Sequence, residues 1–454
     1  MESGFTLEKD QLLKQISGAE DFGPYSKFRS VEANLMLEAT ENELRLPTFT
    51  PTCGDKVFVT TENDHEMLGV EGDLQIGWLR SGSHSNPVPV GVQLSAIPKH
   101  IGLFGVTGSG KTNTELLINA QILEQPNTVG LIFDFHGELW EGKGIGKGLK
   151  DHPHFPFRGR YYPEDKIKIG VGTLSAQDII EIFPDMTDSQ RRACRELERE
   201  IGDFWVQKVR NGNVPSELKA HKLTVEAVLR RISDLNREIF VDVATSLGQK
   251  VVGDLKEGFT VLIDLSGFLW EDQKRIASII TRAVANEYKR VFREDIQKWS
   301  QLPTLLITLE EAHEFLGEEK TFFSDVALTF RKYRVGLCVV TPRPSRINKD
   351  VFAELWTKII MKTTYKGDRE FLTTNTPYLE YSDVEIKVLD RGEALLVSEP
   401  QFRFAVPIKT IHYPEYLEGR EKINYGLEPS TTLSKMDEQL RRITQAGQHL
   451  TLFT

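Results

Sequence analysis

The chain has 454 residues, a formal net charge of −10, 39% hydrophobic residues and 27% charged residues, a composition that fits a globular protein of two or three domains. No apolar run approaches the roughly 18 residues of a membrane helix, the first residues form no basic-then-apolar leader, and the three cysteines are too widely spaced for a disulfide framework or a zinc site. We therefore expect a cytoplasmic protein with no membrane segment. The negative charge argues against a wholly basic DNA-coating protein, but it allows a local basic channel.

Residues 1–95 offer short strand-like pieces after an opening helical pattern at 7–16. The pieces are 43–46, 56–60, 74–79 and 88–92, and Gly, Pro, Asp and Asn punctuate them. Several short strands separated by such turns are typical of a small β-barrel or sandwich. We predict a β-barrel-like N-terminal domain over 1–95.

A glycine-rich loop follows at 105–112 and fits G-x-x-x-x-G-K-[ST], the phosphate-binding loop. It lies between a short apolar strand at 100–104 and a helical pattern at 113–120, which is the context that the motif needs. The alternative is a chance glycine turn before a helix, and the eight matching positions argue against it. The predicted nucleotide-binding residues are Gly105, Thr107, Gly108, Ser109, Gly110, Lys111, Thr112 and Asn113.

The loop also predicts the ligands, which are a nucleoside triphosphate and Mg²⁺; that the triphosphate is ATP follows only from the family resemblance given below. Its glycines let backbone N–H groups turn toward phosphate oxygens, and the helix N-terminus adds a positive dipole. Lys111 is expected to reach the β- and γ-phosphates, and the Thr112 hydroxyl is expected to ligate Mg²⁺.

A second apolar run, 128–133, ends at Asp134 and is followed by Phe-His-Gly-Glu138. A continuous run of this kind favours a buried parallel strand, and ligands of such sheets lie beyond the carboxyl ends of the strands. We therefore expect Asp134, and Glu138 with it, near the phosphates. The alternative is that Asp134 only caps the following turn.

The chain changes in character between 176 and 250, which predicts a helical insertion that divides the ATPase core into 96–175 and 251–412. The segments 188–201 and 225–232 are helical and rich in charge. Their arginines could face nucleic acid, but a solvated helix face with internal i,i+4 pairs is the simpler interpretation.

The second part of the core contains an apolar strand, 302–309, that runs into two carboxylates. Glu310 is expected to hold Mg²⁺ through water, and Glu311 to polarise the attacking water. An acidic helix N-terminus is the alternative. Other predicted elements are strands at 259–266, 335–341, 355–361 and 391–397, a helix at 273–292, and a C-terminal helix at 433–443 within a last segment, 413–454.

In this order the motifs resemble the HerA branch of the HerA/FtsK ring ATPases over roughly residues 74–410. The supporting stretches are 100–112, 134–138, 261–267, 310–313, 331–333, 341–345 and 392–395. The resemblance implies an α/β fold with a RecA-like P-loop NTPase core and a small N-terminal β-barrel, to which the sequence pattern adds the helical insertion and the C-terminal helix. It also implies a hexameric ring with active sites between subunits, which hydrolyses ATP and translocates double-stranded DNA.

Carried over by position, the resemblance makes Glu311 the catalytic carboxylate and Arg331 the arginine finger offered to a neighbouring subunit. From the sequence alone, Arg331 would be a surface arginine at a helix end. Two positions depart from the family pattern: Glu310 stands where Asp is usual, and Pro342 stands where Gln is usual. Pro has no amide side chain and no N–H, so any contact made by that Gln is absent.

The resemblance further implies a partner enzyme. In DNA end processing the partner would be a NurA-like nuclease, and in phage defence it would be a sirtuin-type or nuclease effector. The alternative function is a nucleotide-dependent hexameric scaffold that assembles and activates its partner, with little translocation of its own.

Overall fold

The structure, a computed structural model, describes residues 38–39, 44–45, 68–81, 84–243, 246–317 and 321–424. The chain divides into two compact units, Met1–Val59 and Thr60–Thr454. In the first unit, β1 (Glu38–Ala39) pairs antiparallel with β2 (Leu44–Arg45). The expected helices at 7–16 and 433–443 and the expected strand at 56–60 lie outside the described residues.

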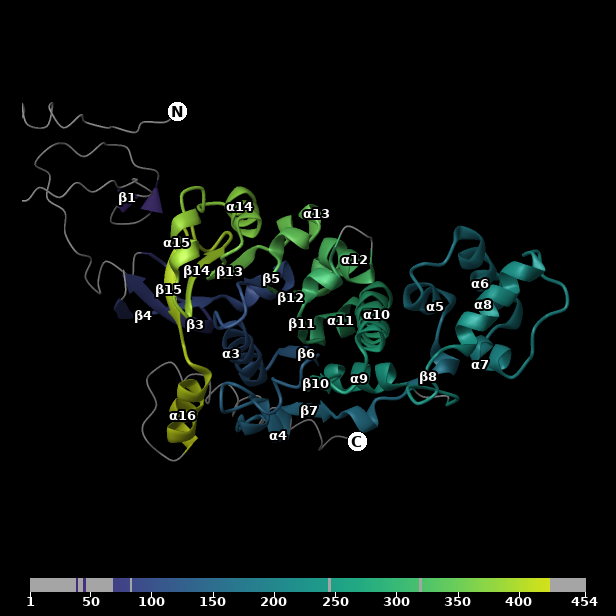
Figure 1. Cartoon of the computed structure of the whole chain (residues 1–454). Coiled ribbons are helices and arrows are strands. Elements are labelled where there is room, and N and C mark those ends of the chain that lie inside the picture. The colour runs from purple at the N-terminus through teal and green to yellow at the C-terminus, as the bar shows by residue number, and fades with distance from the viewer. Residues whose placement is uncertain are drawn as a thin grey trace, which may run out of the picture. The chain divides into compact units, whose positions relative to one another are not determined.

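The second unit is built on one eleven-stranded sheet in the order β4-β3-β15-β14-β13-β5-β12-β11-β6-β10-β7 (Figure 1). The strands from β13 to β7 in this order run parallel to one another. They are β5 (Ile101–Phe104), β6 (Thr128–Asp134), β7 (Gly159–Tyr162), β10 (Thr260–Asp264), β11 (Thr304–Leu309), β12 (Val335–Thr341) and β13 (Thr357–Met361). Every residue of β5, β6 and β12 is buried, as expected of continuous apolar runs in a parallel sheet.

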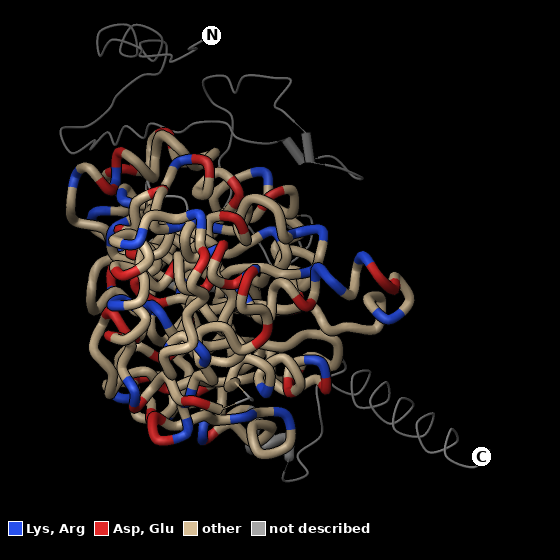
Figure 2. Tube along the Cα trace, turned by 90° about the vertical axis from the view of Figure 1, so that its right-hand side faces the viewer, with Lys and Arg blue, Asp and Glu red and all other residues tan. Residues whose placement is uncertain are grey.

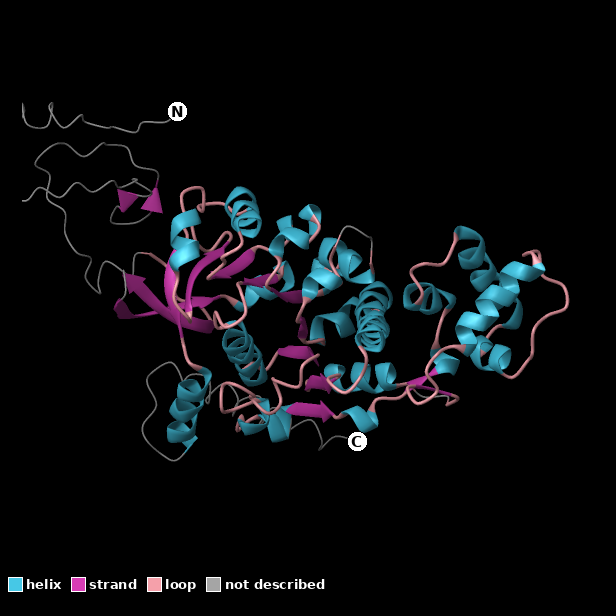
Figure 3. Ribbon diagram, in the orientation of Figure 1, coloured by secondary structure: helices cyan, strands magenta, loops and turns pink. Residues whose placement is uncertain are grey.

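Helices cover both faces of this parallel block (Figure 3). Alternate residues of a strand point to opposite faces. On β11, Leu306 packs in the same cluster as Ile118 of helix α3 (Lys111–Glu124). Its neighbour Leu305 packs in the cluster that contains Ile280 of α10 (Trp270–Glu294). The core is therefore a three-layer α/β/α arrangement, and the predicted α/β class with a P-loop core is confirmed.

The remaining helices of the core lie along these two layers. They are α4 (Phe155–Arg158), α9 (Leu247–Lys256), α11 (Ile296–Gln301), α12 (Phe322–Thr329), α13 (Lys349–Ala353), α14 (Lys366–Asn375), α15 (Asp383–Val388) and α16 (Tyr413–Asn424). Among the described residues, no helix is long and apolar enough to cross a membrane.

An antiparallel extension continues the sheet beyond β13. It consists of β14 (Glu393–Ser398), β15 (Val406–Thr410), β3 (Leu74–Ser81) and β4 (His84–Val92). The strands expected at 74–79 and 88–92 thus belong to the large sheet, where β3 pairs with β15. The β-barrel expected over 1–95 stays a prediction, because most of residues 1–67 lie outside the described part.

The helical insertion forms α5 (Ala176–Ile182), α6 (Asp188–Ile201), α7 (Trp205–Arg210) and α8 (Lys222–Ser233), closed by the short parallel pair β8 (Ile169–Gly170) and β9 (Phe240–Val241) (Figure 1). Arg282 of α10 joins it to the core through Asp178 at 2.9 Å. Arg191 donates to the carbonyls of Met186 and Pro184, and Arg231 forms a two-pronged pair with Asp185 at 2.7 Å. Arg191 and Arg231 thus bind partners within the insertion, although not as the i,i+4 pairs of the simpler interpretation.

Charged residues of both signs are interspersed along the described trace (Figure 2). This pattern agrees with the net charge of −10. For the described residues, we therefore expect charge-dependent recognition from small groups of residues rather than from one broad basic region.

Candidate functional site

The phosphate loop lies between the end of β5 and the start of α3, at the carboxyl edge of the parallel strands. Gly105, Gly108 and Gly110 have φ values of 156°, 83° and 115°, a region that residues with a Cβ rarely adopt. A Cβ on Gly105 would lie 2.7 Å from Ser109 Oγ, whereas one on Gly108 would meet no atom within 4 Å. The loop is closed on the protein side and open on the other, as a cradle for an external anion requires.

Backbone hydrogen bonds brace the loop from two other segments. The Val106 N–H donates to the Lys362 carbonyl at 2.8 Å, and the Gly392 N–H donates to the Ser109 carbonyl at 2.8 Å. The Ser109 side chain faces Met361 and is buried. The loop geometry therefore depends on β13 and on the turn before β14, as well as on its own glycines.

Among the predicted binding residues, Lys111 and Thr112 point into the site, whereas Asn113 is used structurally. The Asn113 amide donates to the Ile411 carbonyl and its oxygen accepts from the Tyr413 N–H, both at 2.8 Å. Asn113 thus ties helix α16 to α3. Thr107 is exposed on the open side of the loop.

Lys111 is surrounded by carboxylates. Its Nζ donates to the Val106 carbonyl at 3.1 Å. Burial lowers the pKa of Lys111, and the negative charges of Glu311 and Glu115 oppose that shift. The Thr112 hydroxyl donates to Glu138 Oε2 at 3.4 Å, which brings the loop and the segment after β6 together.

Asp134 caps the turn after β6, which was the alternative given by the sequence. Its carboxylate accepts the N–H groups of Glu138, Leu139 and Trp140 at 2.9–3.2 Å. Burial raises the pKa of Asp134, and these three N–H groups oppose the rise. By holding this turn, Asp134 presents Glu138 to Thr112.

Glu310 and Glu311 differ in their surroundings although they are adjacent. Glu310 is buried, one of its oxygens (Oε2) has no hydrogen-bond partner, and burial and nearby carboxylates such as Asp134 raise its pKa well above the ordinary range. The side chain of Glu311 is 35% exposed. Its backbone is left-handed (φ 44°), and its side chain makes no capping bond to the short helix that follows.

A left-handed conformation is costly for a residue with a Cβ and is concentrated at functional positions. The geometry of Glu311 thus does not support the helix-cap alternative, since capping requires a side-chain bond to the following N–H groups.

A short polar chain connects Glu311 to β12. His313 Nδ1 lies 3.4 Å from Glu311 Oε2 and 2.9 Å from Thr341 Oγ1. The same hydroxyl of Thr341 accepts the Arg343 N–H at 3.0 Å. Thr341 therefore links the end of β12 to the turn that carries Glu311. It directly precedes Pro342, the residue that stands where the family usually has Gln.

Glu115, on α3, is a residue that the sequence analysis missed. It is fully buried, and neither of its carboxyl oxygens has a hydrogen-bond partner. Burial raises the pKa of Glu115 well above the ordinary value of 4.5, and the negative charge of Glu310 raises it further. The Lys111 cation opposes the rise. No sequence signal marks Glu115, because nearly the whole of α3 is buried, polar residues included.

Glu115→Gln is expected to stabilise the nucleotide-free protein, increasingly so as the pH rises above 4.5. Because the folded state raises the pKa of Glu115, the unfolded chain releases this proton first, and the folded state loses relative stability above the unfolded value of 4.5. Gln has no such proton. Urea unfolding of both proteins from pH 4.5 to 8 measures the difference, which is expected to widen upward. Glu217→Gln, at an exposed position, is the matched control, and a flat Glu115→Gln profile would contradict the assignment.

Arg331 does not join this site in its own chain. It starts the short helix η6 (Arg331–Tyr333), which precedes β12, whereas the phosphate loop follows β5. The two strands are parallel, with Cys338 beside Ile101 and Thr341 beside Phe104. Arg331 therefore lies at the amino-terminal ends of the parallel strands, here called the amino edge of the sheet. The phosphate loop lies at their carboxyl-terminal ends, the carboxyl edge.

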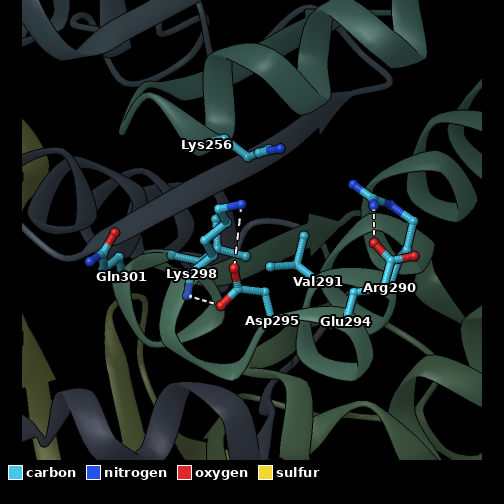
Figure 4. A pocket seen from close by; sticks show the side chains of 8 residues that line it. Lys256, Arg290, Val291, Glu294, Asp295, Lys298 and Gln301 are labelled. Atoms are coloured by element: carbon cyan, nitrogen blue, oxygen red, sulfur yellow. Dashed lines mark hydrogen bonds and ion pairs between the residues drawn. The ribbon is translucent and has the colours of Figure 1, made fainter.

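A cavity of about 700 Å³ lies between the ends of α9, α10 and α11 (Figure 4). Its cations have acidic partners: Lys256 pairs with Glu287 at 2.8 Å, and Lys298 with Asp295 at 3.3 Å. The helices that form it precede β10 and β11, so the cavity is at the edge opposite the phosphate loop. Its cations are already neutralised, which makes it a poor anion site.

The residues that could hold a metal ion are Thr112, Glu138 and Glu310. Among the described residues, no group of three or more His, Cys, Asp and Glu side chains is arranged to hold a metal by itself. Mg²⁺ does not need such a cage, since it binds through one or two protein ligands, water and substrate phosphates. The unpartnered Glu310 Oε2 fits an ion or an ordered water at this point.

Comparison with known proteins gives one family and several relatives. The family model "Helicase HerA, central domain" matches residues 74–284. A relative from Sulfurisphaera tokodaii, named DNA double-strand break repair helicase HerA, is 26% identical over 389 residues, covering 79% of this chain and 73% of that protein. A relative of the same name from Pyrococcus furiosus is 23% identical over 458 residues, covering 87% of this chain and 79% of that protein.

Two solved structures give partial alignments. VirB4 of Thermoanaerobacter pseudethanolicus aligns with a TM-score of 0.49 at 16% identity, covering 76% of this chain and 98% of that chain. The plasmid coupling protein TrwB, in complex with a non-hydrolysable GTP analogue, aligns with a TM-score of 0.48 at 12% identity, covering 71% and 88%.

Proposed function

We propose a function for this chain from the premise that it is a HerA-like P-loop ATPase of the HerA/FtsK superfamily. It is an ATP-hydrolysing enzyme, and its relatives are named as DNA double-strand break repair helicases. The function supported best is an ATP-dependent DNA translocase or helicase. More finely, we propose a hexameric ring that acts on double-stranded DNA together with a nuclease or another effector enzyme.

The chain's own residues divide the work at the carboxyl edge of the sheet. The N–H groups of residues 105–112 bind the phosphates of ATP, and Lys111 neutralises their charge. Glu311 is exposed enough to meet a water molecule, and as a base it would orient that water and accept its proton. His313 contacts Glu311 and is itself hydrogen-bonded to Thr341, so the two residues orient the side chain of Glu311.

Thr112 and Glu310 are the residues proposed to bind Mg²⁺, Thr112 directly and Glu310 through water. When bound, Mg²⁺ neutralises charge that develops on the β- and γ-phosphate oxygens. Glu310 has a longer side chain than the usual Asp. Its buried position, with one oxygen unpartnered, supports a contact through a bridging water. Asp134 acts through the turn that it caps and positions Glu138.

The single observation that supports a multisubunit enzyme is the place of Arg331. It lies at the edge of the sheet opposite its own phosphate loop, so it can meet a phosphate only on another copy of the chain. A closed ring in which each subunit offers this edge to the next would place an arginine at every site.

Arg331→Ala is expected to bind ATP normally and to hydrolyse it about 10³–10⁵-fold more slowly. The reason is that the arginine offered by the neighbouring subunit would stabilise the charge on the transferring phosphoryl group. Steady-state ATPase rates and nucleotide binding measure the two effects. When Arg331→Ala subunits are mixed with Lys111→Ala subunits, some interfaces combine an intact loop with an intact arginine, and activity is expected to return.

Mixed rings whose activity does not exceed the sum of the two variants, after subunit exchange has been verified, would contradict the trans role of Arg331. Lys332→Ala is the matched control, since Lys332 is the next residue and is also exposed.

ATPase turnover with and without duplex DNA tests the DNA-translocating part of the proposal. Stimulation by duplex DNA, together with movement on a labelled duplex, is expected. An ATP turnover that is unchanged by DNA but rises with an added nuclease or other effector would favour the scaffold function. The absence of a Gln amide at the position of Pro342 would then help to explain the missing response to DNA.

A further inference from the structure

An indole at the amino edge of the sheet holds Arg331. The centre of the Arg331 guanidinium lies 4.6 Å from the centroid of the Trp356 indole. We propose that Trp356 is a positioning residue that presents Arg331 to the phosphate loop of a second copy of this chain. This inference rests on the ring and the trans arginine of the proposed function.

The contact differs from the way in which the chain anchors its structural arginines. Arg334, three residues later, donates to the Ser300 and Leu302 carbonyls at 3.1 and 3.3 Å while lying over Trp299. Among the described residues, the Arg331 guanidinium has no such hydrogen bond or ion pair. Stacking orients a guanidinium and leaves its five N–H groups free. Arg331 is thus held in direction while its donors stay available for a phosphate.

Trp356 is itself fixed to the strand that carries the phosphate loop. The backbone N–H of Trp356 donates to the Lys99 carbonyl at 3.0 Å, and its backbone carbonyl accepts the Glu399 N–H at 3.1 Å. The next residue, Thr357, starts β13 in register with Ile101 at the start of β5. The backbone that carries the indole is therefore fixed beside the first residues of β5.

The segments on either side of Arg331 are fixed to the same point by His100. His100 Nδ1 accepts the Leu337 N–H of β12 at 2.9 Å, so the ring carries its proton on Nε2 and donates to the Ala327 carbonyl of α12 at 2.9 Å. Burial lowers the pKa of His100 to about 4, which keeps the ring neutral and this tautomer in place. Because α12 and β12 are both fixed, the backbone near Arg331 is held and only its side chain can still change direction. The Trp356 indole restricts that direction.

The positive charge of the amino edge indicates which surface it would contact on a second copy of the chain. Lys99 Nζ also lies over the Trp356 indole, 4.9 Å from its centroid, so two cations share one aromatic platform. The phosphate-loop edge of the chain carries the partly exposed carboxylates of Glu138 and Glu311 near the loop. The complementary charges suit an interface between the amino edge of one copy and the carboxyl edge of the next.

The test measures ATPase kinetics of Trp356→Leu, Trp356→Phe and the control Lys332→Ala. Loss of the aromatic platform in Trp356→Leu is expected to lower kcat about two- to fivefold with an unchanged KM for ATP. Trp356→Phe, which keeps an aromatic face, is expected to lie between Trp356→Leu and the parent. Thermal melting compares the folded states, and kcat is compared only among variants that melt at the same temperature as the parent. If Trp356→Leu melts at a lower temperature, the comparison uses Trp356→Phe.

The second part of the test separates a trans effect from local damage. Trp356→Leu subunits have an intact phosphate loop, and Lys111→Ala subunits have an intact Arg331 and Trp356. Mixing the two is expected to raise the activity per Trp356→Leu subunit, in parallel with the Arg331→Ala mixture. A role in the fold of its own subunit would not be relieved by the neighbour.

The outcomes distinguish the inference from its premise. Recovery in both mixtures supports the role of Trp356. Recovery with Arg331→Ala, combined with a parent-like kcat or no recovery for Trp356→Leu, overturns the role of Trp356 and leaves the ring intact. No recovery in either mixture overturns the trans arginine, and the role of Trp356 with it.

Discussion

Lys111→Ala is expected to abolish ATP hydrolysis and to leave the fold intact. Among the described residues, the Lys111 ammonium donates a hydrogen bond to one loop carbonyl, that of Val106, at 3.1 Å. Burial disfavours its charged form, as the lowered pKa of Lys111 shows. Removing it therefore costs little stability, but it removes the cation that meets the β- and γ-phosphates.

Phosphate release under saturating ATP measures the loss, and thermal melting shows that the fold is kept. Lys111→Arg keeps the charge with a different shape and is expected to recover little activity, because the two cations are not interchangeable in a fitted site. The exposed Lys166→Ala is the matched control. Hydrolysis by Lys111→Ala at near the parent rate would show that residues 105–112 do not form the nucleotide site.

Glu311→Gln is expected to bind ATP and to lower kcat by about 10²–10⁴-fold, the usual contribution of a general base. Gln has nearly the same shape and tolerates the left-handed backbone (φ 44°) no worse than Glu, but it cannot accept a proton. We expect ATP-bound protein to accumulate, which nucleotide extraction after a single turnover would measure.

Glu314→Gln is the matched control for this experiment. Glu314 contacts the same histidine at the same distance, with Oε1 3.4 Å from His313 Nε2 and Glu311 Oε2 3.4 Å from His313 Nδ1. The control is expected to keep the parent rate. Failure of Glu311→Gln to bind nucleotide would mean that Glu311 serves the metal or the fold, and an equal loss in both variants would mean that His313 is the group that matters.

The sequence by itself determined the parallel core and the phosphate loop. Residues 128–133, 302–309 and 335–341 are continuous apolar runs, and each forms a fully or nearly fully buried parallel strand. The loop is a contiguous motif, so its glycines, Lys111 and Thr112 could be named without knowledge of distant contacts. Both signals are local, and local signals survive in any tertiary arrangement that buries the strands.

Roles that depend on distant partners were only partly predicted. The pattern after β6 left Asp134 open as a site residue or a cap, and three N–H donors from 138–140 make it a cap in this structure. Glu115 was missed, because its isolation is a property of the surfaces packed around α3. The roles of Glu310, Glu311 and Arg331 in catalysis stay predictions that the experiments above test.

Only the tertiary structure decided how far the sheet extends and which edge each residue occupies. Strand β3 pairs with β15 across more than three hundred residues of sequence, with Leu79 beside Ile408, and the short, polar β7 closes the other side beside β10. Periodicity tells a strand from a helix, but it carries no information on the neighbour, because any strand can offer its backbone N–H and C=O groups to any other. The same limit applies to Arg331 and Trp356, which are 25 positions apart: only the parallel register of β12, β5 and β13 brings them together at the edge opposite the phosphate loop.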